Sequence, residues 1–299
     1  MQRRQWLKGA GAAALSFAGI PSAWANGAAT APRLLVVLLR GGMDGLAAVP
    51  PIGDANYAAI RPTIAVQNSL RLDGSFGLHP SLKHLHQLWG QEQLAVVHST
   101  GFAYAGRSHF EGQDVMQSGM PKPYTSASGW LGRAMQVARV AGGVSISIPM
   151  PLILRGNPES STKFPNWMPP LTPTVADSLA ALWSKDGLMS PYAAIIRAEA
   201  ATQRQGAMNR QNFANARSLP ELGRLAGQEM SQPQGPRVGL IDFTHGFDTH
   251  ASQGADQGGH ADQLLKVDQL VQNFQAAMGP MWANALVVTV TEFGRTVAE

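Results

Sequence analysis

The sequence predicts an α/β fold whose mainly parallel sheet carries helices on both faces. Three apolar runs, at residues 34–40, 238–243 and 285–291, show no alternation of polar and apolar positions, which is typical of parallel strands buried on both faces. An amphipathic pattern at 263–278 predicts a helix between the last two runs. Helices that alternate with such strands favour a sandwich of layers around a parallel sheet.

The first 25 residues differ from the rest and are expected to be removed. Arg3 and Arg4 precede a short apolar stretch at 9–20 and the small residues that end at Ala25. This pattern resembles a twin-arginine signal peptide cleaved after Ala25, which implies export by the twin-arginine translocase to the periplasm. The apolar stretch is too short to span a bilayer, so no permanent membrane anchor is expected.

Charge and cysteine content exclude several function classes. The chain has a formal net charge of +4, but Arg3, Arg4 and Lys8 supply three of these charges and the leader contains no acid. The remaining domain is near neutral, so no nucleic-acid partner is expected. The sequence contains no cysteine, which excludes disulfides, thiolate catalysis and cysteine-rich metal sites.

The other elements follow from local patterns along the chain. Residues 50–74 are predicted to form an irregular excursion with a short helix. Helical spacing and apolar runs predict helices at 81–89, 106–117 and 131–140 and strands at 94–98 and 144–149. A loop at 155–175 and a largely helical insertion at about 176–230 come next. We expect one domain at 33–299, incomplete at its C-terminus because no helix or turn closes it after the last strand.

Acidic and histidine side chains follow directly after the three apolar runs. Asp44 lies in the glycine-rich turn after the first run, and Glu292 follows the third. Asp248 and His250 come a few residues after the second. The carboxyl ends of parallel strands meet at one edge of a sheet, so these side chains are expected to share a crevice. Carboxylate oxygens and imidazole nitrogens bind divalent metal ions, which predicts a metal site there.

Several segments together resemble a large bacterial family of exported proteins, the domain-of-unknown-function family 1501. They are the twin-arginine leader, LLRGGMDGL, GRSHFEGQDVMQSG, GFDTH before a long amphipathic helix, and VTEFGRT. The resemblance covers almost all of the chain after the leader. That family is similar to the alkaline phosphatase and sulfatase superfamily, which implies an alkaline-phosphatase-like three-layer sandwich.

The resemblance also implies two divalent cations, of the zinc, magnesium or calcium type. Members of the superfamily hold them with Asp and His side chains at strand ends. Carried over to this chain, Asp44 is the first acid of the metal pair, and Asp248 and His250 bind the other ion. Glu292 is the acid after the last strand, and His109 is a further candidate ligand that either points into the site or only occupies the first turn of its helix.

The same resemblance assigns a nucleophile. Ser108 takes the place of the nucleophilic side chain that bridges toward the metals, and Arg107 is a candidate clamp for the anion. Ser108 and Glu111 also form the S-x-x-E pattern of a helix capping box. The two roles can coexist, because exposed N–H groups at a helix N-terminus bind oxyanions.

Structural interpretations of the proposed ligands stay open at this point. Asp44 fits a turn-forming aspartate, and Asp248 fits a helix N-cap. Glu292 fits an ion pair with Arg295. His245 and His260 lie close in sequence to Asp248 and His250 and favour metal binding there. No spacing argument applies to four other histidines, which are interpreted as surface or core residues: His79, His84, His86 and His98.

Departures from the superfamily pattern bear on activity. Known phosphatases place an Asp-His pair after the last metal-bearing strand, where this chain has Glu292 and Phe293. Relatives in the exported family have an Asp-His-Gly segment further downstream, so without it the metal shell is expected to be incomplete and the polypeptide inactive. The sulfatase variant that matures a cysteine to formylglycine is excluded by the absence of cysteine.

The leading functional prediction is a metal-dependent hydrolase that acts on a phosphate or sulfate ester in the periplasm. Its substrate would be a small molecule or a polymer that carries such an ester. The alternative from another class is a non-catalytic exported envelope or binding protein on the same fold. Metal-dependent isomerisation or phosphotransfer on this scaffold is a third alternative.

Overall fold

The computed structural model divides the chain into two compact units. One comprises Met1–Lys163 and Ser218–Glu299, and the other comprises Phe164–Arg217. The structure describes residues 31–147, 149–163, 173–184, 193, 218–243 and 246–299. The predicted leader at 1–25 lies outside these residues, as does part of the predicted loop at 155–175.

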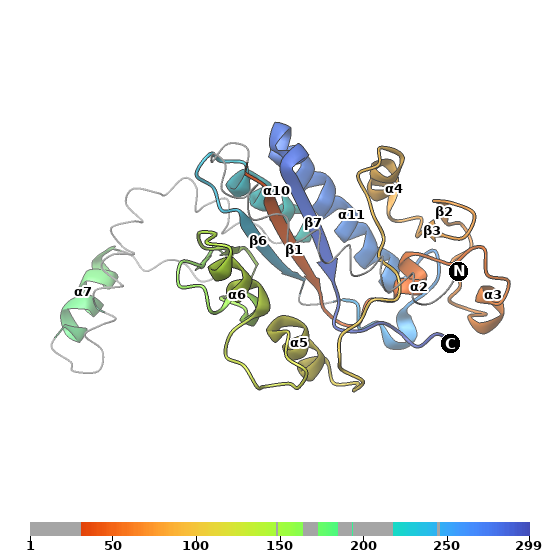
Figure 1. Cartoon of the computed structure of the whole chain (residues 1–299), viewed down its shortest axis with the longest axis horizontal. Helices are drawn as coiled ribbons and strands as arrows, with labels where there is room; N and C mark the ends of the chain where they lie inside the picture. The colour runs from red at the N-terminus through yellow and green to blue at the C-terminus, as the bar shows by residue number, and fades with distance from the viewer. Residues whose placement is uncertain (1–30, 148, 164–172, 185–192, 194–217, 244–245) are drawn as a thin grey trace. The chain divides into compact units, whose positions relative to one another are not determined.

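A five-stranded sheet forms the centre of the first unit (Figure 1). The strands lie in the order β5-β4-β6-β1-β7, with the bounds β1 Arg33–Leu39, β4 Val144–Ser145, β5 Ser161–Thr162, β6 Val238–Phe243 and β7 Ala285–Val290. Every neighbouring pair of these strands is parallel. The predicted α/β class with a mainly parallel sheet is confirmed.

Strand β1 lies between β6 and β7, and both of its faces are covered. Val36 and Leu38 point to one face and join a buried cluster with Met116 of α5 (His109–Ser118) and Leu131 of α6 (Trp130–Val137). The intervening residues of a strand point to the opposite face. Leu35 lies there, and its side chain comes close to Gly239 in β6, beside Met230. An uninterrupted apolar strand is therefore buried on both sides, as its sequence predicts.

The second helical layer consists of α10 (Leu219–Met230) and α11 (Gly259–Met278). In Figure 1 these two helices lie on the side of the sheet away from α5 and α6. Glycines in α10 let the two helices approach closely, because a Cβ at Gly223 would lie 2.3 Å from the carbonyl oxygen of Leu270. The amphipathic pattern of 263–278 is thus explained by burial of one helix face against α10 and the sheet.

Short elements fill the excursion between β1 and α5. They are α2 Gly45–Ala48, α3 Tyr57–Ile60, the antiparallel pair β2 Leu70–Arg71 and β3 Gly77–Leu78, and α4 Lys83–Gly90. The strand predicted at 94–98 is wrong, because this segment is irregular and pairs with none of the described strands. Val97 is exposed, and Glu92 and Ser99 on either side have positive φ angles. An apolar run without a sheet neighbour does not form a strand.

The remaining elements are short or belong to the second unit. Three 3₁₀ segments lie at Leu152–Leu154, His250–Ser252 and Gly279–Asn284. Strand β5 lies inside the predicted loop at 155–175, where two residues are too few to show a periodic pattern. Within the second unit the structure describes α7 (Pro173–Trp183), and α10 at the end of the predicted insertion belongs to the first unit. Of the helices that the structure describes, none is long and apolar enough to cross a membrane.

Candidate functional site

The carboxyl ends of β6, β1 and β7 bring three loops together at one edge of the sheet. Strand β1 runs parallel to both neighbours, so the loops that follow all leave the same edge. Gly41 has φ +112°, and a Cβ there would lie 2.3 Å from the backbone nitrogen of Asp248. A Cβ at Gly42 would lie 2.7 Å from the ring of Phe293. The two glycines after β1 therefore allow the other two loops to reach the turn.

Glu292 is buried at the centre of this edge. Its Oε1 accepts hydrogen bonds from the backbone nitrogen of Gly41 at 2.8 Å, Nδ1 of His109 at 2.9 Å and Nε2 of Gln113 at 3.1 Å. Burial raises the pKa of Glu292, but the hydrogen bonds lower it by more, so its net pKa lies below the usual range. Glu292 is therefore a carboxylate at neutral pH and acts only as an acceptor.

His109 is oriented by this carboxylate. Because Glu292 can only accept, Nδ1 of His109 is the donor, and in the neutral form of the imidazole Nε2 is then left as an acceptor. Nε2 lies 3.6 Å from Oδ2 of Asp248. Phe293 packs on the ring with the centroids 4.6 Å apart. A carboxylate that holds one imidazole nitrogen and leaves the other free is how proteins orient histidines that bind metal or transfer protons.

Asp248 extends the arrangement toward solvent. Its Oδ1 lies 2.9 Å from Nε2 of His250, and the side chains of Asp248 and His250 are 51% and 79% exposed. The contacts therefore run in series. The buried Glu292 contacts His109, His109 faces Asp248, and Asp248 contacts His250 at the surface. We call these four residues the edge cluster. Four of the five predicted metal ligands therefore lie in one group.

The backbone of His250 is strained. Its φ is +46°, in the left-handed region that costs about 1–2 kcal/mol for a residue with a Cβ. Nη1 of Arg295 donates to the carbonyl oxygen of His250 at 2.9 Å and holds this conformation. Strained residues that their surroundings fix are concentrated at functional sites. Arg295 contacts His250 in this way and forms no ion pair with Glu292 among the described residues.

The donors of the edge cluster fit a divalent cation. The two carboxylates give the cluster a formal charge of −2 when both imidazoles are neutral. Imidazole nitrogen and carboxylate oxygen form a donor set that suits zinc and related ions. Among the described residues, no three His, Asp or Glu side chains already converge as a coordination shell. Asp248 and His250 are exposed, so small rotations of their side chains can bring them toward an ion.

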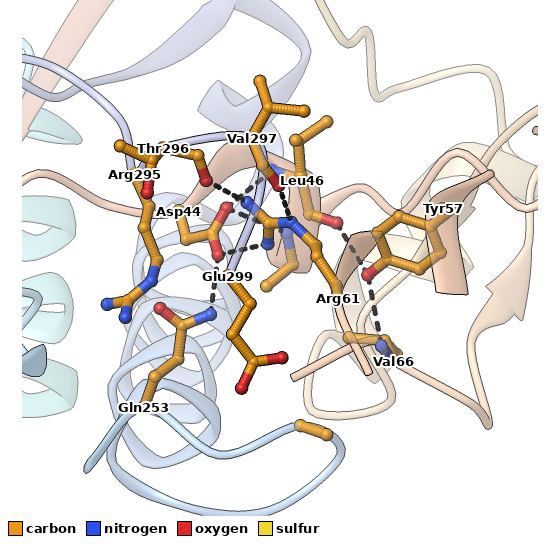
Figure 2. Close-up of polar contacts among 12 residues, drawn as sticks. Asp44, Leu46, Tyr57, Arg61, Val66, Gln253, Arg295, Thr296, Val297 and Glu299 are labelled. Carbon is orange, nitrogen blue, oxygen red and sulfur yellow. Dashed lines mark hydrogen bonds and ion pairs between the residues drawn. The ribbon is translucent and has the colours of Figure 1, made fainter. Parts of the chain in front are cut away.

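Asp44 is buried, and its carboxylate is held by donors outside the edge cluster (Figure 2). Its Oδ1 caps α2 by accepting from the backbone nitrogens of Leu46 and Ala47 at 3.1 and 3.3 Å. Its Oδ2 lies 2.6 Å from Nη1 of Arg61 and 2.6 Å from Nε2 of Gln253. Both oxygens are thus engaged by protein donors, which is the turn-forming arrangement that the sequence left open.

Arg61 connects this acid to the last residues of the chain. The guanidinium is fully buried, and besides Asp44 it donates to the carbonyl oxygens of Val297 and Thr296, each at 2.8 Å (Figure 2). Glu299 donates its backbone N–H to Ile60 at 3.0 Å beside it. The Asp44–Arg61 pair therefore fastens the turn after β1 to the segment after β7.

Ser108 caps α5 immediately before His109. Its Oγ accepts from the backbone nitrogen of Glu111 at 3.4 Å. The reciprocal half of the capping box runs through a tyrosine: the backbone N–H of Ser108 donates to the hydroxyl of Tyr104 at 3.0 Å, and that hydroxyl donates to Oε2 of Glu111 at 2.8 Å. Arg107 is exposed beside this N-terminus.

Two other histidines are buried near Asp44 and lie outside the edge cluster. Nε2 of His79 contacts the carbonyl oxygen of Ala255 at 2.9 Å, and Nδ1 accepts from the backbone nitrogen of Ser81 at 3.1 Å. Burial lowers the pKa of His79, and it lowers the pKa of His260 to about 4. Both imidazoles are therefore neutral at pH 7 and belong to the core. His245 lies outside the described residues.

Two residues that shape this region are not among the site residues predicted from the sequence. Gln113 follows His109 by four residues, a spacing that places both side chains on one face of α5 and that a helical projection would have shown. Arg61 lies in the irregular excursion, where no periodic pattern marks a buried charge. Its role became visible only when the structure placed it against Asp44 and Val297.

Comparison with known proteins identifies a family. The sequence profile of the family described as "Protein of unknown function (DUF1501)" matches residues 31–299, which is nearly the whole chain. The protein therefore belongs to this family, in agreement with the resemblance of its motifs. No curated protein and no solved structure gives a significant match.

Proposed function

We propose that this member of the DUF1501 family is a metal-dependent hydrolase of a phosphate or sulfate ester. The observation that carries the proposal is the orientation of His109, whose Nδ1 is held by the carboxylate of Glu292 while Nε2 faces Asp248. A buried acceptor that fixes the tautomer and leaves the outer nitrogen free is expected for a metal ligand. The exposure of Asp248 and His250 gives solvent and substrate access to the same point.

Each residue of the edge cluster has a distinct role in this proposal. His109, Asp248 and His250 would hold the ion, and Glu292 would orient His109 from behind. A divalent cation at this position supplies positive charge that polarises an ester oxygen. A second ion is less well supported, because Asp44, the acid expected to bind it, already contacts Arg61 and Gln253 with one oxygen and caps α2 with the other.

Ser108 is the proposed nucleophile. It lies at the N-terminus of α5, next to His109, where exposed backbone N–H groups favour an oxyanion. Attack by Oγ on the phosphorus or sulfur would form a serine ester and break the bond to the leaving alcohol, which takes up the hydroxyl proton. Water would then cleave the serine ester, which releases phosphate or sulfate and returns a proton to Oγ. Arg107 is exposed next to Ser108 and is the proposed anion clamp.

Export and fold relationship are also part of the proposal. The Arg3-Arg4 leader supports passage through the twin-arginine translocase to the periplasm. The parallel sheet with helices on both faces supports an alkaline-phosphatase-like sandwich. An ion inserted before export would suit a route that carries folded proteins.

The test combines metal analysis with turnover. We expect the purified full-length protein to contain about one zinc-like ion per chain and to hydrolyse an aryl phosphate or aryl sulfate. Asp248→Ala should lose both the ion and turnover, whereas Ser108→Ala should keep the ion and lose turnover. Asp54→Ala, which removes an exposed acid in the excursion after β1, is the matched control and should change neither. Absence of both ion and turnover in the unmodified protein would refute the hydrolase.

A non-catalytic binding protein is the second candidate function. It is supported by Glu292 and Phe293 in place of an Asp-His pair, and by the structural role of Asp44. This candidate predicts that the protein binds an ion at the edge cluster but turns over no phosphate or sulfate ester. The Ser108→Ala variant would then behave like the unmodified protein in every assay.

A further inference from the structure

A pocket of about 500 Å³ lies beside the edge cluster, between α5 and the segment at 149–155. This volume is in the range of small-molecule sites. Gln113 lines the pocket, and its amide also donates to Glu292, which holds His109. Gln113 therefore belongs to the wall of the pocket and also contacts the edge cluster.

Two guanidinium groups line this pocket. Nη2 of Arg40 lies 2.6 Å from Oδ2 of Asp242, a fully buried carboxylate that fixes the Arg40 side chain in place. Nε of Arg40 is buried and has no hydrogen-bond partner in the described part of the chain, whereas the side chain as a whole is 25% exposed. Arg155 lies at the surface, with Nε and Nη2 each 3.3 Å from the carbonyl oxygen of Met150. Arginines anchored in this way can bind a planar anion.

The acid in the lining offsets these charges only in part. Asp114 also lines the pocket, and its Oδ1 accepts from the backbone nitrogen of Tyr124 at 2.8 Å. Asp242 is buried beneath Arg40 and compensates its charge from behind. The wall that faces a ligand thus contains Arg40 and Arg155 against Asp114. The excess of positive charge in this lining favours an anionic group in the pocket.

Exposed aromatic rings form another part of the wall. Phe110 and Tyr124 are 78% and 66% exposed and both line the pocket, as do Met150 and Leu152. Large apolar side chains left in water beside a concave site are typical of ligand contacts. A flat apolar body can pack on these rings while its charged group reaches a guanidinium.

We propose that this pocket binds the alcohol part of the ester substrate, and that this part is an organic anion with a flat apolar skeleton. This inference rests on the proposed function, because it takes the reaction to be hydrolysis of a phosphate or sulfate ester. It adds a substrate class: esters whose leaving group carries a second anionic group, a carboxylate or a phosphate. The ester group itself would lie at the edge cluster, on the other side of Gln113.

Binding of product-like anions tests the pocket without any turnover. Isothermal titration of the full chain, with a chelator present, would use benzoate and phenylphosphonate as probes and benzyl alcohol as the neutral comparison. We expect at least one anion to bind about 10-fold more tightly than the alcohol. The preference between benzoate and phenylphosphonate identifies the anionic group. Equal affinity for the anions and the alcohol, or no binding of any probe, would overturn the proposal.

Variants then locate the binding. Arg155→Gln should weaken the preferred anion about 10-fold or more, and Phe110→Ala should weaken it about 3- to 10-fold. Both side chains are exposed, so neither substitution should impair folding. Arg71→Gln is the matched control, because Arg71 is exposed and also donates its Nε to a nearby carbonyl, that of Asp73. Binding that is unaffected by Arg155→Gln and Phe110→Ala would place the anion elsewhere and contradict the inference.

A kinetic comparison separates this inference from the proposed function. If the protein is a hydrolase, KM for 4-carboxyphenyl phosphate should be lower than KM for phenyl phosphate, and Arg155→Gln should abolish the difference with little change in kcat. Hydrolysis of both esters with equal KM would refute the pocket assignment and leave the hydrolase intact. Anion binding that depends on Arg155, without hydrolysis of any ester, would support the pocket as a binding site and refute the hydrolase.

Discussion

Asp44 and Glu292 both follow the carboxyl end of a strand but have different partners. Each is a buried acid that follows the carboxyl end of a parallel strand, and the two strands, β1 and β7, are neighbours. Asp44 faces the guanidinium of Arg61 at 2.6 Å. Glu292 faces the imidazole of His109 at 2.9 Å, together with neutral amide donors.

The two acids differ in the chemistry of their partners, a guanidinium for Asp44 and an imidazole for Glu292. Asp44 pairs with a permanent cation, and both of its oxygens accept hydrogen bonds from protein donors. Glu292 directs a histidine whose second nitrogen faces exposed side chains. A buried carboxylate after a parallel strand is thus held by a cation in one case and by a histidine in the other.

The largest effect is expected from breaking the buried pair. Asp44→Asn should lower the free energy of unfolding by about 3–5 kcal/mol, because Arg61 would remain buried without its counter-charge. Urea unfolding of this variant, with Asp54→Asn at an exposed acid as control, measures the effect. A variant of normal stability that had lost a bound ion would show that Asp44 is a ligand and that the comparison with Glu292 is mistaken.

Acid should lower the free energy of unfolding through His260, which is buried near Asp44. The pKa of His260 falls from 6.5 to about 4 on folding, chiefly through burial. The unfolded chain therefore takes up this proton first, and stability should decline as the pH falls from about 6.5 to 4, by on the order of 3 kcal/mol. His260→Gln should flatten this pH dependence, whereas His98→Gln, at an exposed histidine, should leave it unchanged. If stability depended on pH in His260→Gln as it does in the unmodified protein, His260 would not be the group responsible.

Glu292→Gln should affect metal binding more than folding. Loss of a carboxylate behind a ligating histidine lowers metal affinity about 10- to 100-fold, or about 1.4–2.7 kcal/mol, because His109 is no longer held by a charged acceptor. Competition with a chromogenic zinc chelator would measure the change, with Glu221→Gln on the surface of α10 as control. Equal zinc affinity in Glu292→Gln and the unmodified protein would argue against the proposed role of His109.

The smallest effect on stability is expected at His250. His250→Gly relieves the left-handed backbone but adds flexibility to the unfolded chain, so stability should stay the same or rise by up to about 1 kcal/mol. His250→Asn also tolerates this backbone and tests the side chain alone. Both variants should bind the metal more weakly. If both lost stability instead, His250 would be a structural residue like Asp44.

Elements with long local patterns could be predicted from the sequence. The apolar runs of β1, β6 and β7 and the amphipathic pattern of α11 each match an element of the structure. The segment at 94–98 has a similar run but no partner, and β5 has a partner but only two residues. A strand needs a neighbour to satisfy its backbone, and a single sequence does not say which runs have one.

The candidate site was predictable to the extent that topology decides it. Parallel strands deliver their carboxyl ends to one edge, so Asp248, His250 and Glu292 were expected together. Arg61 could not be foreseen, because its contact with Asp44 joins the excursion after β1 to residues after β7. The pairing of Gln113 with Glu292 likewise depends on how α5 lies against the end of β7.

The sequence by itself determined the class of fold, the main strands and the set of acids and histidines at their ends, because these follow from local periodicity and from chain direction. Only the tertiary structure decided that Asp44 pairs with the guanidinium of Arg61 and that Glu292 contacts the imidazole of His109. It also decided that β7, almost as apolar as β1, lies at the sheet edge with Leu286 and Val288 exposed. The physical reason is that the charge state and burial of a side chain depend on neighbours distant in sequence.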